Sequence, residues 1–188
     1  MGKKISSKHD VAGRKLIYQI YPTAIGDLRD IKDALPLIAK LKPDYIWLNP
    51  IFVSPWVDGG YDVADYCKID PRFGTMADFK RLVAEAKKYN IGILLDLVLN
   101  HTSNQHPWFQ KSIMHDSWYK DYYIWLDRPL NWNSFFGGPA FDYEARRGEY
   151  YLHLYDQSQP DLNFKNPRVV REFKNIIKFW KDQGVAGF

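Results

Sequence analysis

The chain has 188 residues, 46% of them hydrophobic and 26% charged, a composition that suits a globular protein with a sizeable core. Its net charge of +4 lies in residues 1–15, which hold five Lys or Arg and one Asp, so the other residues sum to zero. A neutral body argues against nucleic-acid binding, and the lack of an apolar run of about 18 residues argues against a membrane span.

Strand and helix patterns alternate along the chain. Short apolar or β-rich runs predict strands at residues 16–21, 45–48 and 91–99, with a further strand beginning at 185–188. Apolar residues at helical spacing predict helices at residues 31–41, 76–89 and 169–183. Asp30 is the predicted N-cap of the first helix, and Gly184 is expected to end the last.

This alternation is typical of parallel βαβ units, and it leaves two architectures open, a doubly wound sheet and a (β/α)8 barrel. No G-x-G-x-x-G follows a predicted strand, so the main sign of dinucleotide binding is missing. Asn100 and His101 end the third strand, where barrels place their ligand groups. We therefore expect an α/β fold, and the position of these two residues favours the barrel.

Residues 104–163 interrupt the alternation, and a loop of this length is expected to carry structure of its own. The run YYLHLY at 150–155 is typical of a strand, so we interpret the segment as a subdomain inserted over the barrel mouth. The expected organisation is a basic, disordered tail at 1–15, the first part of the barrel at 16–103, the insertion at 104–163, and the third barrel helix with the start of a fourth strand at 164–188.

An aspartate lies inside the apolar stretch LLDLVLNHTS, residues 94–103. By strand alternation, Asp96, Val98 and Asn100 are expected to point to one face. A carboxylate there is costly unless it is hydrogen-bonded or paired. One interpretation is a satisfied structural Asp followed by an Asn-His cap, and the other is a ligand site at the end of the strand.

The loop GGYDVADY, residues 59–66, follows the second predicted strand and is expected to open on the same side. Tyr61 offers an aromatic face and Asp62 an acceptor, although this sequence is also typical of an ordinary turn. Aromatic residues make up 16% of the chain, and aromatic faces beside polar groups suit hydroxyl-rich ligands. Together with Asp96 and His101, these residues predict a sugar site.

Several motifs agree in order and spacing with one known family: YQIYP (18–22), IWLNPIF (46–52), GYDVADY (60–66), FGTMADF (73–79), DLVLNHTS (96–103), YKDYYIW (119–125), YYLHLY (150–155) and QPDLNF (159–164). From residue 16 to residue 188 the chain resembles glycoside hydrolase family 13, the α-amylase family, and within it the oligo-1,6-glucosidase and dextran glucosidase group. The resemblance implies an α/β fold that is the N-terminal part of a (β/α)8 TIM barrel, with the insertion as domain B. It also implies a retaining, exo-acting α-glucosidase for short α-glucosides such as isomalto-oligosaccharides, and we expect no cofactor.

The resemblance also implies roles for the candidate site residues. Asp62 would hold the non-reducing glucose, Tyr61 would stack on that ring, and His101 would donate to one of its hydroxyls. Asp96 would orient the arginine of the nucleophile motif, and Asn100 would brace the loops between the barrel and domain B.

Members of this group commonly carry an Asp/Asn/Gly-rich metal loop after the first strand. Here only Asp27 remains of that loop. A hard cation such as Ca²⁺ needs six or more oxygen ligands, so no metal is expected at this position.

The catalytic pair is expected to lie beyond this chain. The family requires an aspartate nucleophile in G-F-R-x-D on the fourth strand and a glutamate acid/base. The chain reaches only Gly187-Phe188 of that motif, so neither member of the pair is expected within it, and these 188 residues alone are expected to be inactive. Turnover by these 188 residues would instead require a search for a nucleophile among Asp142, Glu144 and Asp161.

Alternatives stay open. The protein is expected to act on an α-glucoside oligosaccharide, but a trehalose-6-phosphate- or sucrose-directed member fits the same motifs. A non-catalytic relative such as the heavy chain of amino-acid transporters is a further alternative, although Asp62 and His101 are present and no membrane helix is expected before residue 16. A truncated, non-functional gene product also remains open. The single cysteine, Cys67, and the lack of a charged-then-apolar leader lead us to expect a cytoplasmic protein without nucleic-acid or membrane partners.

Overall fold

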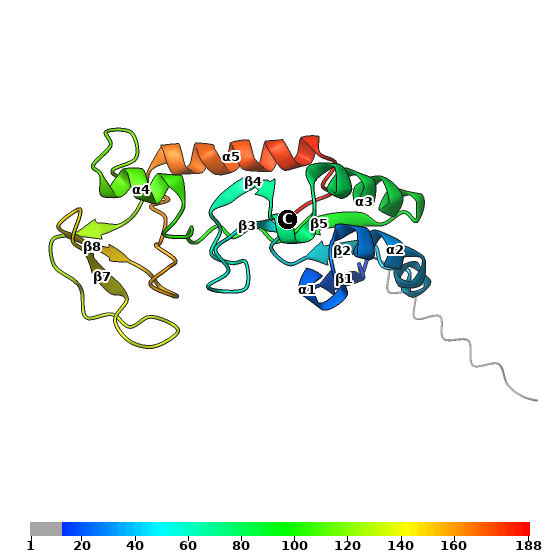
Figure 1. The fold of residues 1–188 in the computed structure, drawn as a ribbon, viewed down its shortest axis with the longest axis horizontal. Helices are drawn as coiled ribbons and strands as arrows, with labels where there is room; N and C mark the ends of the chain where they lie inside the picture. The colour runs from blue at the N-terminus through cyan, green and yellow to red at the C-terminus, as the bar shows by residue number, and fades with distance from the viewer. Residues whose placement is uncertain (1–12) are drawn as a thin grey trace, which may run out of the picture.

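The computed structural model describes residues 13–188, and its first sheet contains three parallel strands (Figure 1). The strands lie in the order β1 (Ile17–Ile20), β2 (Tyr45–Leu48) and β5 (Gly92–Leu95). β5 ends four residues earlier than its apolar sequence predicts. Of the segment expected to be a disordered tail, residues 1–12 lie outside the described residues, whereas Lys15 forms an ion pair with Asp44 at 2.8 Å.

The end of the chain adds to the far side of β5. The Ala186 N–H donates to the Ile93 carbonyl at 2.8 Å, and the Leu95 N–H donates to the Gly187 carbonyl at 3.1 Å. The four parallel segments therefore lie side by side in chain order. A doubly wound sheet reverses this order at a switch point, whereas a barrel does not, so the arrangement favours the barrel of the two architectures.

Helices α1 (Pro22–Ile25), α2 (Leu28–Ile38) and α3 (Met76–Lys88), with the short 3-10 helix η1 (Ala39–Leu41), follow β1 and precede β5. The start of α2 corrects the sequence expectation. Asp27, not Asp30, is the N-cap, and its carboxylate accepts from the Arg29 and Asp30 N–H groups. Asp30 occupies the third helical position and accepts from the Asp27 N–H at 2.8 Å, which completes a capping box.

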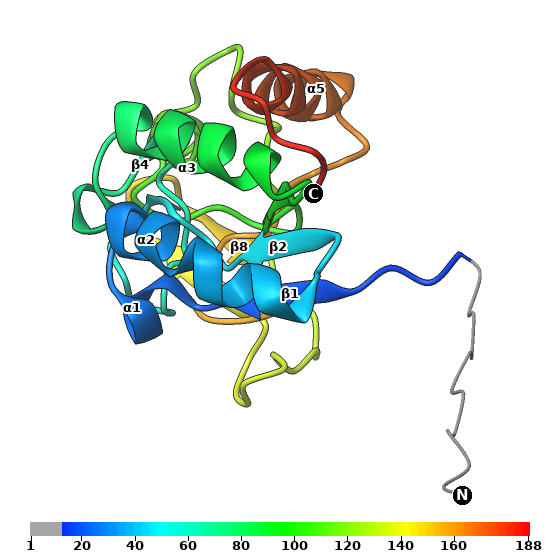
Figure 2. The same ribbon diagram turned by 90° about the vertical axis from the view of Figure 1, so that its right-hand side faces the viewer.

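α2 and α3 lie together beside the sheet (Figure 2). Burial of a large apolar side chain stabilises a fold by about 1.5–3 kcal/mol, so this layer is the main source of stability in the barrel part. The buried side chains from the strands and the two helices are Ile20, Ile46, Leu48, Ile93, Leu95, Leu28, Ile31, Leu35, Phe79, Leu82 and Val83. The alternate strand residues Trp47 and Leu94 are only half-buried, so the opposite face of the sheet is more open.

An antiparallel hairpin lies between β2 and α3, and the sequence did not predict it. It consists of β3 (Phe52–Val53) and β4 (Asp65–Ile69), with an irregular register between them. The 3-10 helix η2 (Pro71–Phe73) then leads into α3. A two-residue strand is too short to show an alternating pattern, which explains why it was missed.

Residues 104–163 form a separate lobe (Figure 1). It contains α4 (Pro107–Ile113) and an antiparallel sheet in the order β6 (Trp125–Leu126), β8 (Glu149–Leu152) and β7 (Phe141–Glu144). The strand expected at 150–155 corresponds to β8, which ends at Leu152.

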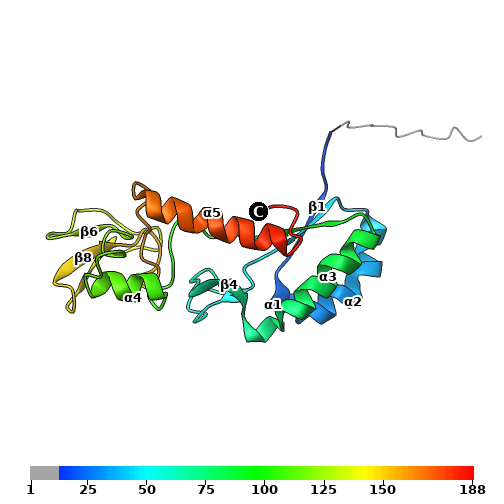
Figure 3. The same cartoon turned by 90° about the horizontal axis from the view of Figure 1, so that it is seen from above.

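The long helix α5 (Pro167–Asp182) runs along both lobes (Figure 3). Near its start, Phe173 contacts Trp108 of α4 edge-on, with ring centres 6.1 Å apart. Near its end, the buried Trp180 packs on Phe52 and Phe79, and its indole N–H donates to the Tyr66 carbonyl at 2.7 Å. Within residues 13–188, no helix is both long enough and apolar enough to cross a membrane.

Replacement of Trp180 by Ala should lower the free energy of unfolding by about 3–5 kcal/mol, because it leaves a large cavity and removes the donor to Tyr66. Urea unfolding followed by circular dichroism measures this change. The control is Lys178→Ala, which removes an exposed ion pair with Asp182 and should cost no more than about 0.5 kcal/mol. Equal losses in the two variants would contradict this account of α5.

Candidate functional site

A small cavity of about 260 Å³ lies beyond the carboxyl ends of the parallel strands, where the loop after β2 meets the loop after β5 and the lobe formed by residues 104–163. Carboxyl ends of parallel strands meet at one edge of a sheet, which is why loops distant in sequence converge there. The lining residues are Asp58, Tyr61, Asp96, Val98, Leu99, Asn100, His101, Phe136 and Tyr155.

The Asp96 carboxylate is held by donors from two other elements. Its Oδ2 atom accepts from the Tyr61 hydroxyl at 3.0 Å and from the Trp47 indole N–H at 3.2 Å. Asn49 donates to the Tyr61 hydroxyl at 2.9 Å and accepts from Gln19 of β1 at the same distance. The sequence predicted both a structural and a ligand-site reading for Asp96, and the structure contains features of each: a satisfied oxygen and a position on the cavity.

Burial raises the pKa of Asp96, although the two donors oppose this change. Burial, followed by the nearby Asp96 charge, raises the pKa of Tyr61 to about 12. Tyr61 therefore keeps its proton at neutral pH and remains a donor to Asp96.

His101 contributes a neutral imidazole to the cavity. Its side chain is buried, and burial lowers its pKa to about 4, although the Tyr61 carbonyl and the charges of Asp58 and Asp62 oppose this. Asn100 Nδ2 lies 3.2 Å from His101 Nδ1, so the neutral ring accepts there and carries its proton on Nε2. Nε2 has no partner in hydrogen-bond geometry among residues 13–188, which leaves a buried donor available.

Asp62, which is expected to hold the glucose, does not line the cavity as its side chain stands in this structure. The side chain is 0% exposed, and its carboxylate accepts from the Ser54 hydroxyl at 2.9 Å, the Val57 N–H at 3.0 Å and the Asp58 N–H at 3.1 Å. These bonds use both oxygens to hold the loop in shape. Asp62 is therefore a structural residue in this geometry.

Asp58 lines the cavity instead, and the sequence reasoning missed it. Its Oδ2 atom accepts from Gln159 Nε2 at 2.8 Å. The signal lay in the spacing Asp58-Gly59-Gly60-Tyr61: both glycines have positive φ, and the Tyr61 N–H donates to the Asp58 carbonyl at 2.9 Å. This turn brings the two side chains to the same cavity.

The lobe of residues 104–163 adds two aromatic residues that were also missed. Phe136 is 63% exposed, and its ring centre lies 5.7 Å from that of Tyr155. Tyr155 also packs against His101 at 5.3 Å. Sequence composition indicated aromatic rings near a site but did not indicate which ones, because their approach depends on the folding of the whole lobe.

Asp96, Val98 and Asn100, which strand alternation placed on one face, all line this cavity. Leu99 lines it as well, because the extended strand ends at Leu95. Asn100 is also connected to the segment that follows the lobe: its carbonyl accepts from the Leu162 N–H at 2.9 Å.

None of the three alternative nucleophiles lines this cavity. Asp161 is buried, accepts from the Leu154 N–H at 2.8 Å, and has its pKa raised to about 6 by burial. Asp142 lies 3.2 Å from His153, and Glu144 pairs with Arg146 at 2.9 Å. Asp58 and Asp96 are the only carboxylates that line the cavity within the described part of the chain.

No cluster of three or more His, Cys, Asp or Glu in residues 13–188 is arranged to hold a metal ion. Asp27, the one remaining residue of the expected metal loop, is committed to capping α2 and to an ion pair with Arg29.

Comparisons with known proteins agree on one family. The family described as "Alpha amylase, catalytic domain" matches residues 9–188. Trehalose-6-phosphate hydrolase of Escherichia coli (strain K12) is 48% identical over 185 residues, and oligo-1,6-glucosidase of Parageobacillus thermoglucosidasius is 46% identical over 187 residues. Each alignment covers 92% of this chain but only 34% and 33% of the relatives. The chain thus spans about a third of their length.

Solved structures agree with these relatives. The crystal structure of Bacillus licheniformis trehalose-6-phosphate hydrolase superposes with a TM-score of 0.89 at 43% identity, covering 93% of this chain and 34% of that one. An isomaltulose synthase mutant from Erwinia rhapontici NX5, in complex with sucrose, gives a TM-score of 0.88 at 44% identity over 92% of this chain and 34% of that one.

Replacement of Asp62 by Ala should lower the free energy of unfolding by about 2–4 kcal/mol, because three donors lose their acceptor in a buried loop. Chemical unfolding measures the loss. Asp58→Ala is the matched comparison, since it removes a carboxylate from the same loop but leaves only one side-chain donor, Gln159 Nε2, without its acceptor, and it should cost about 1–1.5 kcal/mol. A larger loss of stability in Asp58→Ala than in Asp62→Ala would show that Asp58 is the structural member of the pair.

Stability should fall as the pH drops from about 6.5 to about 4. Burial lowers the pKa of both His101 and His106 from 6.5 to about 4, so the unfolded chain binds more protons across this range. His106→Asn keeps a good N-cap for α4 and should show a shallower pH slope of the urea midpoint.

The pH slope of His106→Asn must be compared with that of the wild type. Asp161 adds a slope of opposite sign to both proteins, between pH about 6, where burial places its pKa, and 3.8, its ordinary pKa. An identical slope in the two proteins would contradict the prediction for His106.

Proposed function

The chain belongs to the α-amylase family, and from this premise we propose that it is the N-terminal part of a retaining, exo-acting α-glucosidase for short α-glucosides such as isomalto-oligosaccharides. The proposal includes a (β/α)8 barrel whose first strands are β1, β2 and β5, with residues 104–163 as domain B beside its mouth. It also includes a cytoplasmic location, with which the single Cys67 is compatible.

The observation that carries the proposal is the composition of the small cavity. A carboxylate, a neutral imidazole donor and aromatic rings meet in about 260 Å³. Sugar hydroxyls both donate and accept hydrogen bonds, and sugar rings have apolar faces, so this set of groups suits a single glucose ring.

Roles follow from these positions. Asp58 accepts from hydroxyls of the terminal glucose, in place of the role expected for Asp62, and the Nε2–H of His101 donates to another. Tyr61 contributes its ring while its hydroxyl stays on Asp96. Asp96 keeps its Oδ1 oxygen for the arginine of the nucleophile motif. Asn100 braces the junction with the lobe through Leu162.

The chemistry itself needs a nucleophilic aspartate and a glutamate acid/base about 5–5.5 Å apart, which we place after Phe188. The aspartate attacks the anomeric carbon while the glutamate protonates the leaving oxygen. Water then releases the glucose from the aspartate, and the deprotonated glutamate acts as base. The 188 residues alone are proposed to be inactive for this reason.

The relatives leave a phosphorylated substrate and sucrose as alternatives, since both a trehalose-6-phosphate hydrolase and a sucrose-bound enzyme are similar to this chain. No Lys or Arg lines the cavity among the described residues, whereas two carboxylates do. A phosphate is repelled by such a lining, so this part of the site favours a neutral glucoside. A non-catalytic relative would have no need of the unpartnered His101 donor.

The test uses the intact protein that contains this chain and an aryl α-glucoside as substrate. Asp58→Ala and His101→Ala should each lower kcat/KM by about 100-fold or more, because contacts to the reacting ring strengthen in the transition state. Asp33→Ala, on the exposed side of α2, is the matched control and should keep wild-type activity.

Near-normal activity of both site variants, or no turnover by the intact wild type, would overturn the proposal. Sequencing beyond Phe188 provides a second check, since the proposal requires Arg, any residue and then Asp.

A further inference from the structure

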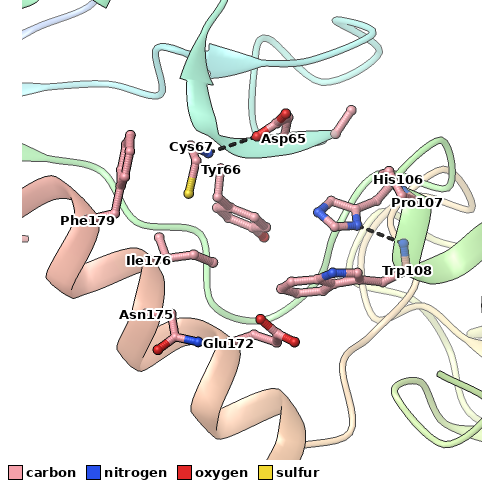
Figure 4. Close-up of a pocket in the computed structure, with 11 residues that line it drawn as sticks. Asp65, Tyr66, Cys67, His106, Pro107, Trp108, Glu172, Asn175, Ile176 and Phe179 are labelled. Carbon is pink, nitrogen blue, oxygen red and sulfur yellow. Dashed lines mark hydrogen bonds between the residues drawn. The ribbon is translucent and has the colours of Figure 1, made fainter. Parts of the chain in front are cut away.

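A second, larger cavity lies between β4, the start of α4 and α5 (Figure 4). Its volume is about 480 Å³, which is within the range of small-molecule sites. The lining residues are Ala64, Asp65, Tyr66, Cys67, His106, Pro107, Trp108, Glu172, Asn175, Ile176 and Phe179. None of them lines the candidate active-site cavity.

His106 supplies a donor to this cavity. The residue is 5% exposed, and its Nδ1 atom accepts from the Trp108 N–H at 3.1 Å as the N-cap of α4. A neutral ring that accepts at Nδ1 carries its proton on Nε2. No hydrogen bond joins Nε2 to another group in the described part of the chain, and Figure 4 shows this nitrogen turned toward the cavity, where it is open to a ligand or to water.

Acceptors lie across the cavity from His106. Glu172 of α5 uses its Oε1 atom to accept from the Tyr122 hydroxyl at 3.1 Å, and it forms no ion pair within residues 13–188. Asp65 of β4 is a second carboxylate, although Lys68 is within 3.0 Å of it. Asn175 adds an exposed amide at the rim.

The floor between these polar groups is aromatic and apolar. The rings of Tyr66 and Trp108 are stacked with centres 6.3 Å apart, and Phe179 and Ile176 continue the surface along α5. Such a surface fits the C–H face of a ring rather than a fully polar ligand.

These groups together select a ligand class. An anion is repelled by Asp65 and Glu172, and no Lys or Arg lines the cavity. A quaternary ammonium suits the carboxylates and aromatic rings, but it has no acceptor for His106 Nε2–H. Hydroxyl groups accept from His106 and donate to the carboxylates at once. We propose that this cavity is a second binding site, separate from the candidate active site, for a neutral polyhydroxylated molecule such as a glucosyl unit.

The proposal stands apart from the proposed function, because it depends on His106, Glu172 and the aromatic floor alone. Its test therefore observes His106 directly. The intact protein is labelled with ¹⁵N-histidine, the His106 imidazole signal is assigned by its loss in His106→Asn, and glucose or isomaltose is titrated. We expect an Nε2–H tautomer and a saturable shift of the His106 signal with either sugar, whether or not Asp58→Ala is also present.

Two variants of α5 locate the binding. Asn175→Trp fills the cavity from its exposed rim and should weaken the sugar response about tenfold or more, while the neighbouring exposed Lys174→Trp, which lies outside the lining, should leave it unchanged. Glu172→Gln keeps an acceptor for Tyr122 and should weaken sugar binding only several-fold.

Other kinds of site, or no site, would give different results in these titrations. A shift with tetramethylammonium but not with glucose would overturn the proposal in favour of a cation site. No shift of His106 with either sugar up to the limit of solubility, or equal responses in Asn175→Trp and Lys174→Trp, would also overturn it. If the intact wild-type protein did not hydrolyse the aryl α-glucoside but the His106 signal still shifted with sugar, only the proposed function would be contradicted.

Discussion

The carboxylate of Asp96 is the constraint on which the candidate site depends. A charge at the end of an apolar strand must have donors, and here Tyr61 and Trp47 supply them from the loop after β2 and from β2 itself. Asn49 and Gln19 extend the same network to β1. The loops at this edge therefore take their positions from the register of three parallel strands, so a slip of one strand would disconnect the network and displace the cavity lining.

Two aspartates only four residues apart illustrate how burial separates structural from ligand-facing groups. Asp62 receives three hydrogen bonds from its own loop and has no exposed surface, whereas Asp58 receives one side-chain bond, from Gln159, and reaches the cavity. The first keeps the second in place, since the Asp58 N–H is one of its donors. A carboxylate already satisfied on both oxygens has little capacity left for a ligand.

Local patterns in the sequence predicted the regular elements well and long-range contacts poorly. β2 occupies the predicted residues, and α3 differs at one end by a single residue, because apolar periodicity is a local property. The N-cap of α2 was placed at Asp30 rather than Asp27, since both residues of a capping box are typical of helix starts.

At the site, the regions were predicted but the choice between Asp58 and Asp62 was not. The turn Asp58-Gly59-Gly60-Tyr61 indicates that Asp58 lies near Tyr61, but the sequence does not indicate that the loop of residues 54–58 encloses the Asp62 carboxylate. Phe136 and Tyr155 were missed for a related reason, because they reach the cavity only through the fold of a lobe whose strands have two to four residues.

The course of α5 has a consequence for how the molecule loses its structure. Its first turns contact the lobe of residues 104–163 through Phe173 and Glu172, and its last turns bury Trp180 against the hairpin and α3. Opening of either lobe would expose one half of the same continuous helix and weaken its contacts with the other. Amides of the two lobes should therefore share a common slow hydrogen-exchange unit centred on α5, which makes the pair one cooperative body rather than two independent domains.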